Sequence, residues 1–478
     1  MNIHDCPDWR NVRERRRHRH GNGDDDELVQ LDGIVERDLD HDHFRCVRYR
    51  ERHRGLHRRF EHRDVVAHRH HDDRRPDVYG HAGLVNLSLS MKTICLVAAL
   101  MCAVASPAAA QSVSEVLTFL MTNQSVNTGN PAQDLAAAQA TSDTISRALL
   151  ANLATLPVSA SSSGFTYRLN NTLGTFERVT PSFGPFFVER ALTVGTLQAS
   201  MGLTFQEMRF TTLDGRALRN GSLVLTANKF VNQSAPFDVN QLTLKIDASV
   251  ATLYGNVGVT DRLELGFAMP VVSLRLDGSR VNTYFGSSYI QATATATAVG
   301  LADVVARGKY ILYADSGTSL GAAVDVRLPT GRQEDLLGAG STSARFAGIG
   351  SIESGPWSGH VNAGITVGGL AREINYSGAL AWAASDRVTV TGELLGRWLD
   401  SPGGITEVTG PNSSIAGVET TRLLPDTSKL NIVTVMPGVK WNLSGTWVLA
   451  ANVGVPLTKA GLVSPAIPFI GLDYAFGR

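Results

Sequence analysis

Apolar and polar residues alternate along most of the chain after Phe165. The alternation is clearest in 241–250, and it recurs in 318–328, 387–398 and 446–457. Successive side chains of a β-strand point to opposite faces of the sheet. Each of these segments therefore predicts a strand with one apolar and one polar face.

The connections between these strands differ regularly in length. Tight turns fall at 260–261, 315–317, 354–356, 385–386 and 443–445. Longer loops alternate with them at 277–298, 329–340, 400–427 and 458–464, and 369–372 is a short exception. A soluble sandwich has no reason for this pattern, whereas an outer-membrane barrel has short periplasmic turns and long outer loops. The predicted fold class is an all-β, transmembrane, antiparallel up-and-down β-barrel.

The number of strands can be counted backwards from the C-terminus. Eleven strands lead back to Leu242, and a periplasmic N-terminus requires an even total. Strands in 165–230 then complete a barrel of 12–14 strands, and we favour fourteen. Five of the six Trp lie near strand ends, where amphipathic rings suit the membrane interface: Trp357, Trp382, Trp398, Trp441 and Trp447. The last strand ends on Phe476, close to the terminal signal of barrel assembly, although Gly477-Arg478 follow.

Residues 113–156 carry a helical period instead. Val113, Val116, Leu117 and Leu120 are spaced for one helix face, and Asn130-Pro131 marks a second helix start. The second helix has its own apolar stripe, formed by Ile145, Leu149, Leu153 and Leu156, and Pro157 ends the pattern. We expect 111–160 to be a helical segment that plugs the barrel or lies beneath it in the periplasm, and 161–478 to form the barrel.

A secretory signal precedes these helices. Met91-Lys92 gives a positive start, 94–104 is apolar, and Ser106–Ala110 supplies small residues for cleavage. The apolar run is shorter than the about 20 residues that span a bilayer. We therefore expect 91–110 to be a signal peptide that is cleaved near Ala110.

The first 90 residues have a different composition. They hold 18 Arg, 18 Asp or Glu, 12 His and no Lys, without an apolar period. Such a stretch cannot bury enough apolar area to fold. Its charges cancel, which disfavours a nucleic-acid arm, and a His-rich metal tract around His68 is a minor alternative. We interpret 1–90 as a spurious or disordered extension ahead of the true start at Met91.

The chain from Gln111 onward excludes several classes. It has no Cys, and its 25 Lys or Arg nearly balance 26 Asp or Glu, so neither disulfides nor nucleic-acid binding is indicated. No apolar run reaches about 18 residues, which excludes transmembrane helices.

The segment Leu328-Pro329-Thr330-Gly331-Arg332-Gln333-Glu334-Asp335-Leu336-Leu337-Gly338-Ala339-Gly340 resembles a bacterial outer-membrane family. That family is described as transporter-like and is also named after the meta-pathway of phenol degradation. The segments 375–380 and 391–397 are similar to it too, and the resemblance covers about 240–476. It implies an outer-membrane barrel for the uptake of small hydrophobic or aromatic compounds.

Strand parity gives the candidate site residues. Charges that face lipid at mid-membrane cost about 2–4 kcal/mol for Arg or Lys, so we expect the charged residues of the strands to line the lumen. They are Lys245, Asp247, Arg262, Glu264, Asp303, Arg307, Lys309, Asp325, Arg327, Glu373, Glu393 and Arg397. They either tune a permeation path or fill a closed interior as paired charges.

Two further features are less specific indications of a functional site. Arg332, Glu334 and Asp335 lie in the 329–340 loop, which either folds inward as a constriction or stays on the surface. His360 is the one His after residue 110, and parity places it inside the barrel near a turn. A lone His is more often structural, so we expect no enzyme activity, no metal site and no cofactor.

These patterns favour a passive outer-membrane channel of a Gram-negative bacterium, porin-like in the sense of admitting small-molecule solutes. Its other expected partners are outer-membrane lipid and the barrel assembly machinery, and nucleic acid is not among them. The alternative is a structural or surface-interaction barrel with a closed lumen.

The signal pattern generates a direct prediction. N-terminal sequencing of membrane-purified protein should begin near Gln111, because the composition changes there from a signal peptide to a helical segment. A peptide from 1–90 in that sample would contradict it.

Overall fold

The structure is a computed structural model that describes residues 111–122, 131–153, 167–170, 175–178, 180–400, 402–412, 414–426 and 428–476. These residues belong to one compact unit, Asn86–Arg478. The extension 1–90, the signal peptide 91–110 and the region around Pro157 lie outside the described residues. Among the helices that are described, none has the length and apolar character to cross a membrane.

Twelve antiparallel strands form a closed ring. Around the ring they are β3 (Ala199–Phe210), β7 (Asp238–Gly258), β8 (Leu263–Tyr284), β10 (Val304–Asp315), β11 (Thr318–Leu328), β12 (Ser343–Ser354), β13 (Trp357–Gly368), β14 (Arg372–Ser385), β15 (Val388–Asp400), β18 (Leu430–Asn442), β19 (Trp447–Pro456) and β21 (Ile467–Phe476). β21 pairs with β3, which sets Phe476 opposite Ala199. A closed ladder leaves no free edge, as hydrocarbon requires. The predicted fold class is confirmed.

The outer face of this ring is apolar and exposed. Leu203, Phe205, Val361 and Leu380 are between 50% and 65% exposed. A contiguous apolar exterior of this kind suits lipid and not water. At the short-turn end, Trp357 and Trp382 stack with ring centroids 5.8 Å apart, which agrees with an interfacial aromatic belt.

The preference for fourteen strands was wrong. The eleven strands counted back to Leu242 are present, and β3 alone completes the ring. β1 (Tyr167–Asn170) and β2 (Thr175–Arg178) pair only with each other. β4 (Thr212–Leu213), β5 (Arg216–Ala217) and β20 (Leu462–Val463) form a separate small sheet. The ring therefore begins at Ala199 and not near residue 161.

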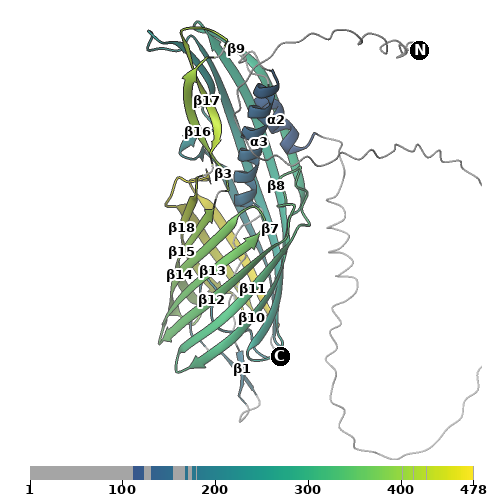
Figure 1. Cartoon of the computed structure of the whole chain (residues 1–478). Helices are drawn as coiled ribbons and strands as arrows, with labels where there is room; N and C mark the ends of the chain where they lie inside the picture. Colours follow the sequence, from purple (N-terminus) through teal and green to yellow (C-terminus); the bar gives the residue numbers. More distant parts are fainter. Residues whose placement is uncertain are drawn as a thin grey trace, which may run out of the picture. The chain divides into compact units, whose positions relative to one another are not determined.

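β7 and β8 continue far beyond the ring. They have 21 and 22 residues, whereas a strand needs about 9–11 to cross a membrane. Their extensions pair with β6 (Leu223–Phe230) and β9 (Ser287–Leu301), and β17 (Val418–Asp426) and β16 (Gly404–Pro411) add to β6 (Figure 1). We call this six-stranded sheet, in the order β16-β17-β6-β7-β8-β9, the outer sheet.

The outer sheet replaces two of the predicted loops, 277–298 and 400–427. The first is the β8–β9 hairpin, and the second contains the β16–β17 hairpin. In 292–298 the Ala residues are buried or half-buried and the Thr residues are exposed. This Ala-Thr alternation is a true strand pattern, but its small apolar members give a weak signal.

Two helices pack on the inner face of the outer sheet. They are α2 (Val113–Thr122) and α3 (Pro131–Leu153), and they confirm the two helices that the helical period predicted. Ser112 and Glu115 cap α2 reciprocally, at 3.1 and 3.2 Å. The buried stripes of both helices join the sheet in one hydrophobic core, whose members include Leu117, Leu120, Ile145, Leu149, Leu242, Leu244, Ile246, Leu274 and Leu276.

The structure places the helices neither in the bore nor below the barrel. The short turns lie at the opposite end of the barrel, near the C-terminus (Figure 1). The last turn of α3 reaches the rim of the ring, where the Ala151 carbonyl accepts from Arg397 at 2.9 Å. The apolar stripes needed an apolar partner, and the outer sheet supplies it.

The contact of α2 with the outer sheet is testable at two neighbouring residues. Leu120 is 0% exposed, and it lies so close to Gly278 that a Cβ there would meet it at 2.0 Å. Leu120→Ala should weaken helix docking by about 2–5 kcal/mol through cavity formation, seen as faster proteolysis of 111–153. Phe119→Ala, at a 53% exposed position, should leave the rate unchanged. Equal rates for both variants would argue against the packing.

Candidate functional site

A segment of irregular backbone enters the ring from the short-turn end. It comprises residues 180–198, and we call it the lumenal segment. Pro181 and Pro185 lack the N–H that a strand ladder needs, and Gly184 adopts a φ of 67°, which favours glycine. Phe186 and Phe187 are buried and pack edge-to-face on Phe469 of β21, with ring centroids 4.4 and 4.9 Å away.

Two buried charges of opposite sign bind the backbone of this segment. The Glu393 carboxylate accepts the N–H groups of Phe186, Phe187 and Val188 at 2.6, 2.7 and 2.9 Å. The Lys440 ammonium donates to the Pro185 carbonyl at 2.7 Å. Charge-assisted hydrogen bonds in a water-poor interior are strong. Together the two side chains bind three backbone N–H groups and a backbone carbonyl of the segment.

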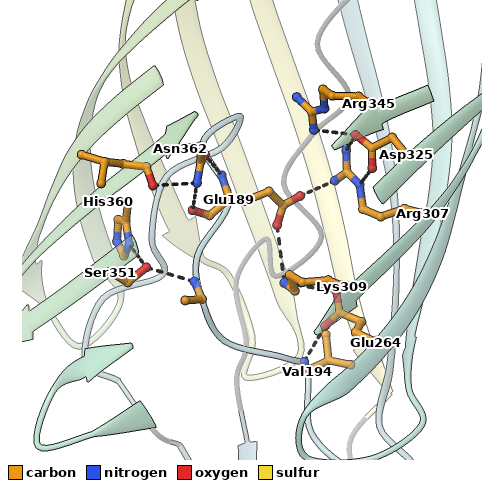
Figure 2. A network of polar contacts seen from close by, with 12 residues as sticks. Glu189, Val194, Glu264, Arg307, Lys309, Asp325, Arg345, Ser351, His360 and Asn362 are labelled. Atoms are coloured by element: carbon orange, nitrogen blue, oxygen red, sulfur yellow. Dashed lines mark hydrogen bonds and ion pairs between the residues drawn. The ribbon is translucent and has the colours of Figure 1, made fainter. Parts of the chain in front are cut away.

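Glu189 connects the lumenal segment to β10, a ring strand that is not a neighbour of β15 and β18 (Figure 2). Its carboxylate pairs with Arg307 and, at 3.4 Å, with Lys309, both of β10. Arg307 also pairs with Asp325 of β11 at 2.6 Å, and Asp325 pairs with Arg345 at 2.5 Å. The cations and carboxylates alternate, so each buried charge has a neighbour of opposite sign, which offsets desolvation.

The same network extends toward the short turns. Lys309 pairs with Glu264 of β8 at 3.3 Å. The Glu264 carboxylate also accepts the Val194 N–H at 2.7 Å (Figure 2). At the end of the segment, Thr196 donates to Asp261 in the turn after β7 at 2.5 Å. The segment is therefore tied to the wall along its whole length.

Neutral side chains complete the attachment. Asn362 accepts the Glu189 N–H at 2.8 Å and donates to the Glu189 carbonyl at 3.0 Å. Ser351 accepts the Ala191 N–H at 3.0 Å, and His360 contacts Ser351 at 2.8 Å (Figure 2). This lone His thus positions a hydroxyl that holds the segment. In the described part of the chain, no group of three or more His, Cys, Asp or Glu could hold a metal ion.

Two adjoining cavities lie between the lumenal segment and the end of α3. One has a volume of about 130 Å³ and the other about 90 Å³, and both are lined by Phe187, Leu395 and Arg397. We call them together the lumenal chamber. The larger part is lined by charged residues, including Asp325, Arg327, Arg345 and Glu373. The smaller part is lined mainly by apolar residues, including Met208, Phe210, Ile432 and Met436.

Arg397 lies where the two cavities meet. It binds Glu373 with two hydrogen bonds, at 2.8 and 2.7 Å, and its third contact is the carbonyl of Ala151. A bidentate pair fixes the plane of the guanidinium. Arg397 therefore joins the charged wall of the chamber to the helical segment above it.

Eight of the twelve candidate charges lie on the inner side of the ring strands: Glu264, Arg307, Lys309, Asp325, Arg327, Glu373, Glu393 and Arg397. The network groups four of them, Glu264, Arg307, Lys309 and Asp325, with Glu189 of the lumenal segment. Paired charges do fill much of the interior, yet the chamber remains between them.

Lys245 and Asp247 were placed on the wrong face. They lie on the outer surface of β7, opposite the buried Leu244 and Ile246, and Asp247 pairs there with Arg219. Alternation shows which residues share a face but not which face meets water. Beyond the ring the inner face meets helices and is apolar, so the polar face turns outward.

Two other candidates lie at the ends of strands. Arg262 is exposed in the turn between β7 and β8. Asp303 is fully buried, but its carboxylate accepts the N–H groups of Gly331 and Ala339 at 3.1 and 2.8 Å. It anchors the 329–342 loop and does not line the chamber.

That loop does not constrict the barrel with charge. Arg332 is exposed and pairs with Asp335, and the Glu334 carbonyl accepts the Ser114 N–H of α2 at 3.1 Å. Leu336 and Leu337 are instead buried in the core of the outer sheet. The apolar residues of the loop turn inward because the helices offer them an apolar partner.

Sequence reasoning missed three charged groups of the network, Glu189, Arg345 and Lys440. Parity would have found two of them, since Lys440 precedes the outward Trp441 and Arg345 precedes the outward Phe346. Glu189 could not be found this way because 180–198 has no strand pattern. Its signal was the pair of prolines in a region expected to supply strands.

The role of Glu393 is testable by backbone hydrogen exchange. In Glu393→Gln the amide nitrogen cannot accept a hydrogen bond, so the N–H groups at 186–188 lose charged acceptors. We expect their exchange to accelerate at least about tenfold, since bonds to charged groups contribute about 1.5–3 kcal/mol. Glu373→Gln, which changes a carboxylate paired with Arg397, is the matched control. Equal protection in both variants would contradict the role.

Comparison with protein-family models and with curated proteins found no match. Several solved structures are similar. The COG4313 outer membrane channel from Pseudomonas putida F1 is 13% identical, covers 60% of this chain and 98% of that chain, and has a TM-score of 0.40. The KdgM porin, solved with disordered oligogalacturonate, is 11% identical, with coverages of 50% and 99% and a TM-score of 0.28.

The translocator domain of the autotransporter NalP from Neisseria meningitidis is also similar. It is 11% identical, covers 59% of this chain and 89% of that chain, and has a TM-score of 0.27. The fold assigned to this chain rests on its own strand pairing and not on these similarities.

Proposed function

We propose that this protein is an outer-membrane channel for the passive uptake of small solutes, in which the lumenal segment is the main restriction. The observation that carries the proposal is the lumenal chamber. It lies inside a complete ring, and it is bounded by a segment that is held by side-chain hydrogen bonds and is no part of the wall.

The size of the ring supports a solute pathway that the lumenal segment restricts. Side chains fill a barrel of about 8 strands, and one of about 16–18 strands leaves an aqueous channel. Twelve strands lie between these cases. A barrel of this size needs something to decide whether it conducts, and the lumenal segment occupies the position where it can do so.

The lining supports small solutes with an apolar part. Along the chamber, charged groups are mutually paired and apolar side chains lie beside them. Paired charges repel an apolar solute less than isolated ones do. The resemblance of 328–340 to the transporter-like family extends the proposal to hydrophobic or aromatic compounds.

The proposed location is the outer membrane of a Gram-negative bacterium. The apolar exterior, the short turns at one end and Phe476 at the end of the last ring strand support insertion by the barrel assembly machinery, after cleavage of the signal peptide near Ala110. The short turns would then face the periplasm, and the outer sheet would stand outside the cell.

The alternative is a surface-interaction barrel with a closed lumen. A specific observation favours it, because the tips of the outer sheet expose an aromatic cluster. Phe237 stacks between Phe230 and Phe285 at 4.7 and 5.4 Å, and Phe285 is 64% exposed. An exposed cluster of this kind is typical of a binding surface.

A cysteine lock distinguishes the two functions. A Cβ at Gly321 of β11 would lie 3.7 Å from the Ala191 Cβ, within the about 3.5–4.5 Å that a disulfide spans. The chain after Ala110 has no other Cys. In planar bilayers, the Ala191→Cys/Gly321→Cys double variant should conduct less when oxidised than when reduced, because the disulfide fixes the segment to the wall.

Gly321→Cys alone should not respond to reductant, which controls for the substitution itself. Equal, high conductance of the oxidised and reduced double variant would show that solutes pass without moving the segment. Absence of conductance in the wild type, the reduced double variant and Glu393→Gln would favour the closed-lumen alternative.

A further inference from the structure

Among the described residues of the outer sheet, three buried side chains keep polar atoms without a hydrogen-bond partner. They are Thr226 of β6, Asn240 of β7 and Arg280 of β8, and they are 3%, 0% and 0% exposed. The unpaired atoms are the Thr226 hydroxyl, both ends of the Asn240 amide, and Nε and Nη2 of Arg280. Nearly all buried polar groups in folded proteins have a partner, which an ion or a water can supply.

Strand register brings these three side chains together on one face of the outer sheet. Thr226 pairs directly with Asn240 across β6 and β7. Asn240 pairs with Asn282 across β7 and β8, so Arg280 is the diagonal neighbour of Asn240 on the same face. Diagonal neighbours in an antiparallel sheet are about 7–8 Å apart, within reach of a long side chain. Three adjacent strands therefore present a hydroxyl, an amide and a guanidinium side by side.

The guanidinium of Arg280 is bound at one corner only. Its Nη1 donates to the carbonyl of Leu120, in the last turn of α2, at 3.2 Å. Nε and Nη2 form the planar edge that can bind an anion with two parallel hydrogen bonds. Arg397 uses this same edge to hold Glu373. In Arg280 the edge is buried and has no hydrogen-bond partner in the described part of the chain.

The buried charge of Arg280 is not offset by any carboxylate that the structure describes. Asp238 lies on the same face of β7, but it pairs with Tyr284, four residues beyond Arg280. Its carboxylate instead accepts the amide groups of Asn228 and Asn282, at 2.9 and 2.6 Å. A buried cation needs a counter-charge as well as hydrogen-bond acceptors. A water would satisfy the donors of Arg280 and leave its charge uncompensated, so the site favours an anion.

We propose that the outer sheet holds a small inorganic anion of the size of chloride at the Nε and Nη2 edge of Arg280. The Asn240 amide and the Thr226 hydroxyl donate further hydrogen bonds to it. The near-complete burial of the three side chains favours a monatomic ion. Because Arg280 also binds the last turn of α2, the anion stabilises the docking of this helix on the sheet. The site lies beyond the ring, so the inference is independent of the proposed channel.

Halide-dependent proteolysis of the detergent-solubilised protein tests the site. Sodium gluconate, whose anion is too large for an enclosed site, is replaced stepwise by sodium chloride or bromide at constant ionic strength, which keeps the screening of surface charges equal. We expect cleavage of 111–153 to slow saturably. The slowing should be about tenfold at a halide concentration ten times the dissociation constant, because an anion that binds only the docked state stabilises it by mass action.

Variants locate the site. Arg280→Met removes the charge and nearly keeps the length of the side chain, so the helix should stay docked while the halide response disappears. Asn240→Leu removes one donor and should raise the half-saturating halide concentration about fivefold. Arg275→Met is the matched control on the outer face of β8, where the Arg275 side chain is 63% exposed and pairs with Asp277. This control should respond to halide as the wild type does.

Folding of each variant is checked by the different gel migration of unboiled and boiled protein, and Arg280→Gln replaces Arg280→Met if the latter does not fold. A crystal grown in bromide should show an anomalous peak within hydrogen-bond distance of Nε and Nη2 of Arg280. A water without anomalous signal at this edge, a wild type that does not respond to halide, or a response that persists without Arg280 would overturn the inference.

Discussion

The uninterrupted pairing of β7 with β8 is the constraint on which the rest of the structure depends. The ladder runs from Asp238 opposite Tyr284 to Gly258 opposite Glu264, about twice the length that a membrane requires. One half of this ladder is a wall of the ring, and the other half must stand in water. Its inner apolar face would be exposed there without α2 and α3. The helical segment therefore belongs to the outer sheet, and the interior of the ring is left to a different part of the chain.

That part is the lumenal segment, and its backbone explains the buried charges around it. Irregular backbone inside a barrel has N–H and C=O groups that no strand satisfies. Glu393 of β15 and Lys440 of the neighbouring β18 satisfy several of them, and Glu189 of the segment forms an ion pair with β10. The charges of Glu393, Lys440 and Glu189 are thus explained by holding the segment.

Local sequence patterns predicted most of the barrel wall and little of what lies inside the barrel. Alternation predicted eleven ring strands and the helical period predicted the two helices, because both signals reside within ten or twenty residues. It misplaced Lys245 and Asp247, since parity cannot tell a face that meets lipid from one that meets water or a helix. Glu264, Glu393 and Arg397 were found because charge is costly on a lipid-facing wall. Glu189 was not, because its position depends on contacts with β10 that are more than a hundred residues away.

The closure of the ring also sets when the barrel can be completed. β3 and β21 are the first and last ring strands, and their pairing is the seam. Because β3 pairs with β7 on one side only, its other edge stays unpaired until β21 is in place. The lumenal segment leads directly into β3, so it is attached to the first ring strand while the last one is still missing.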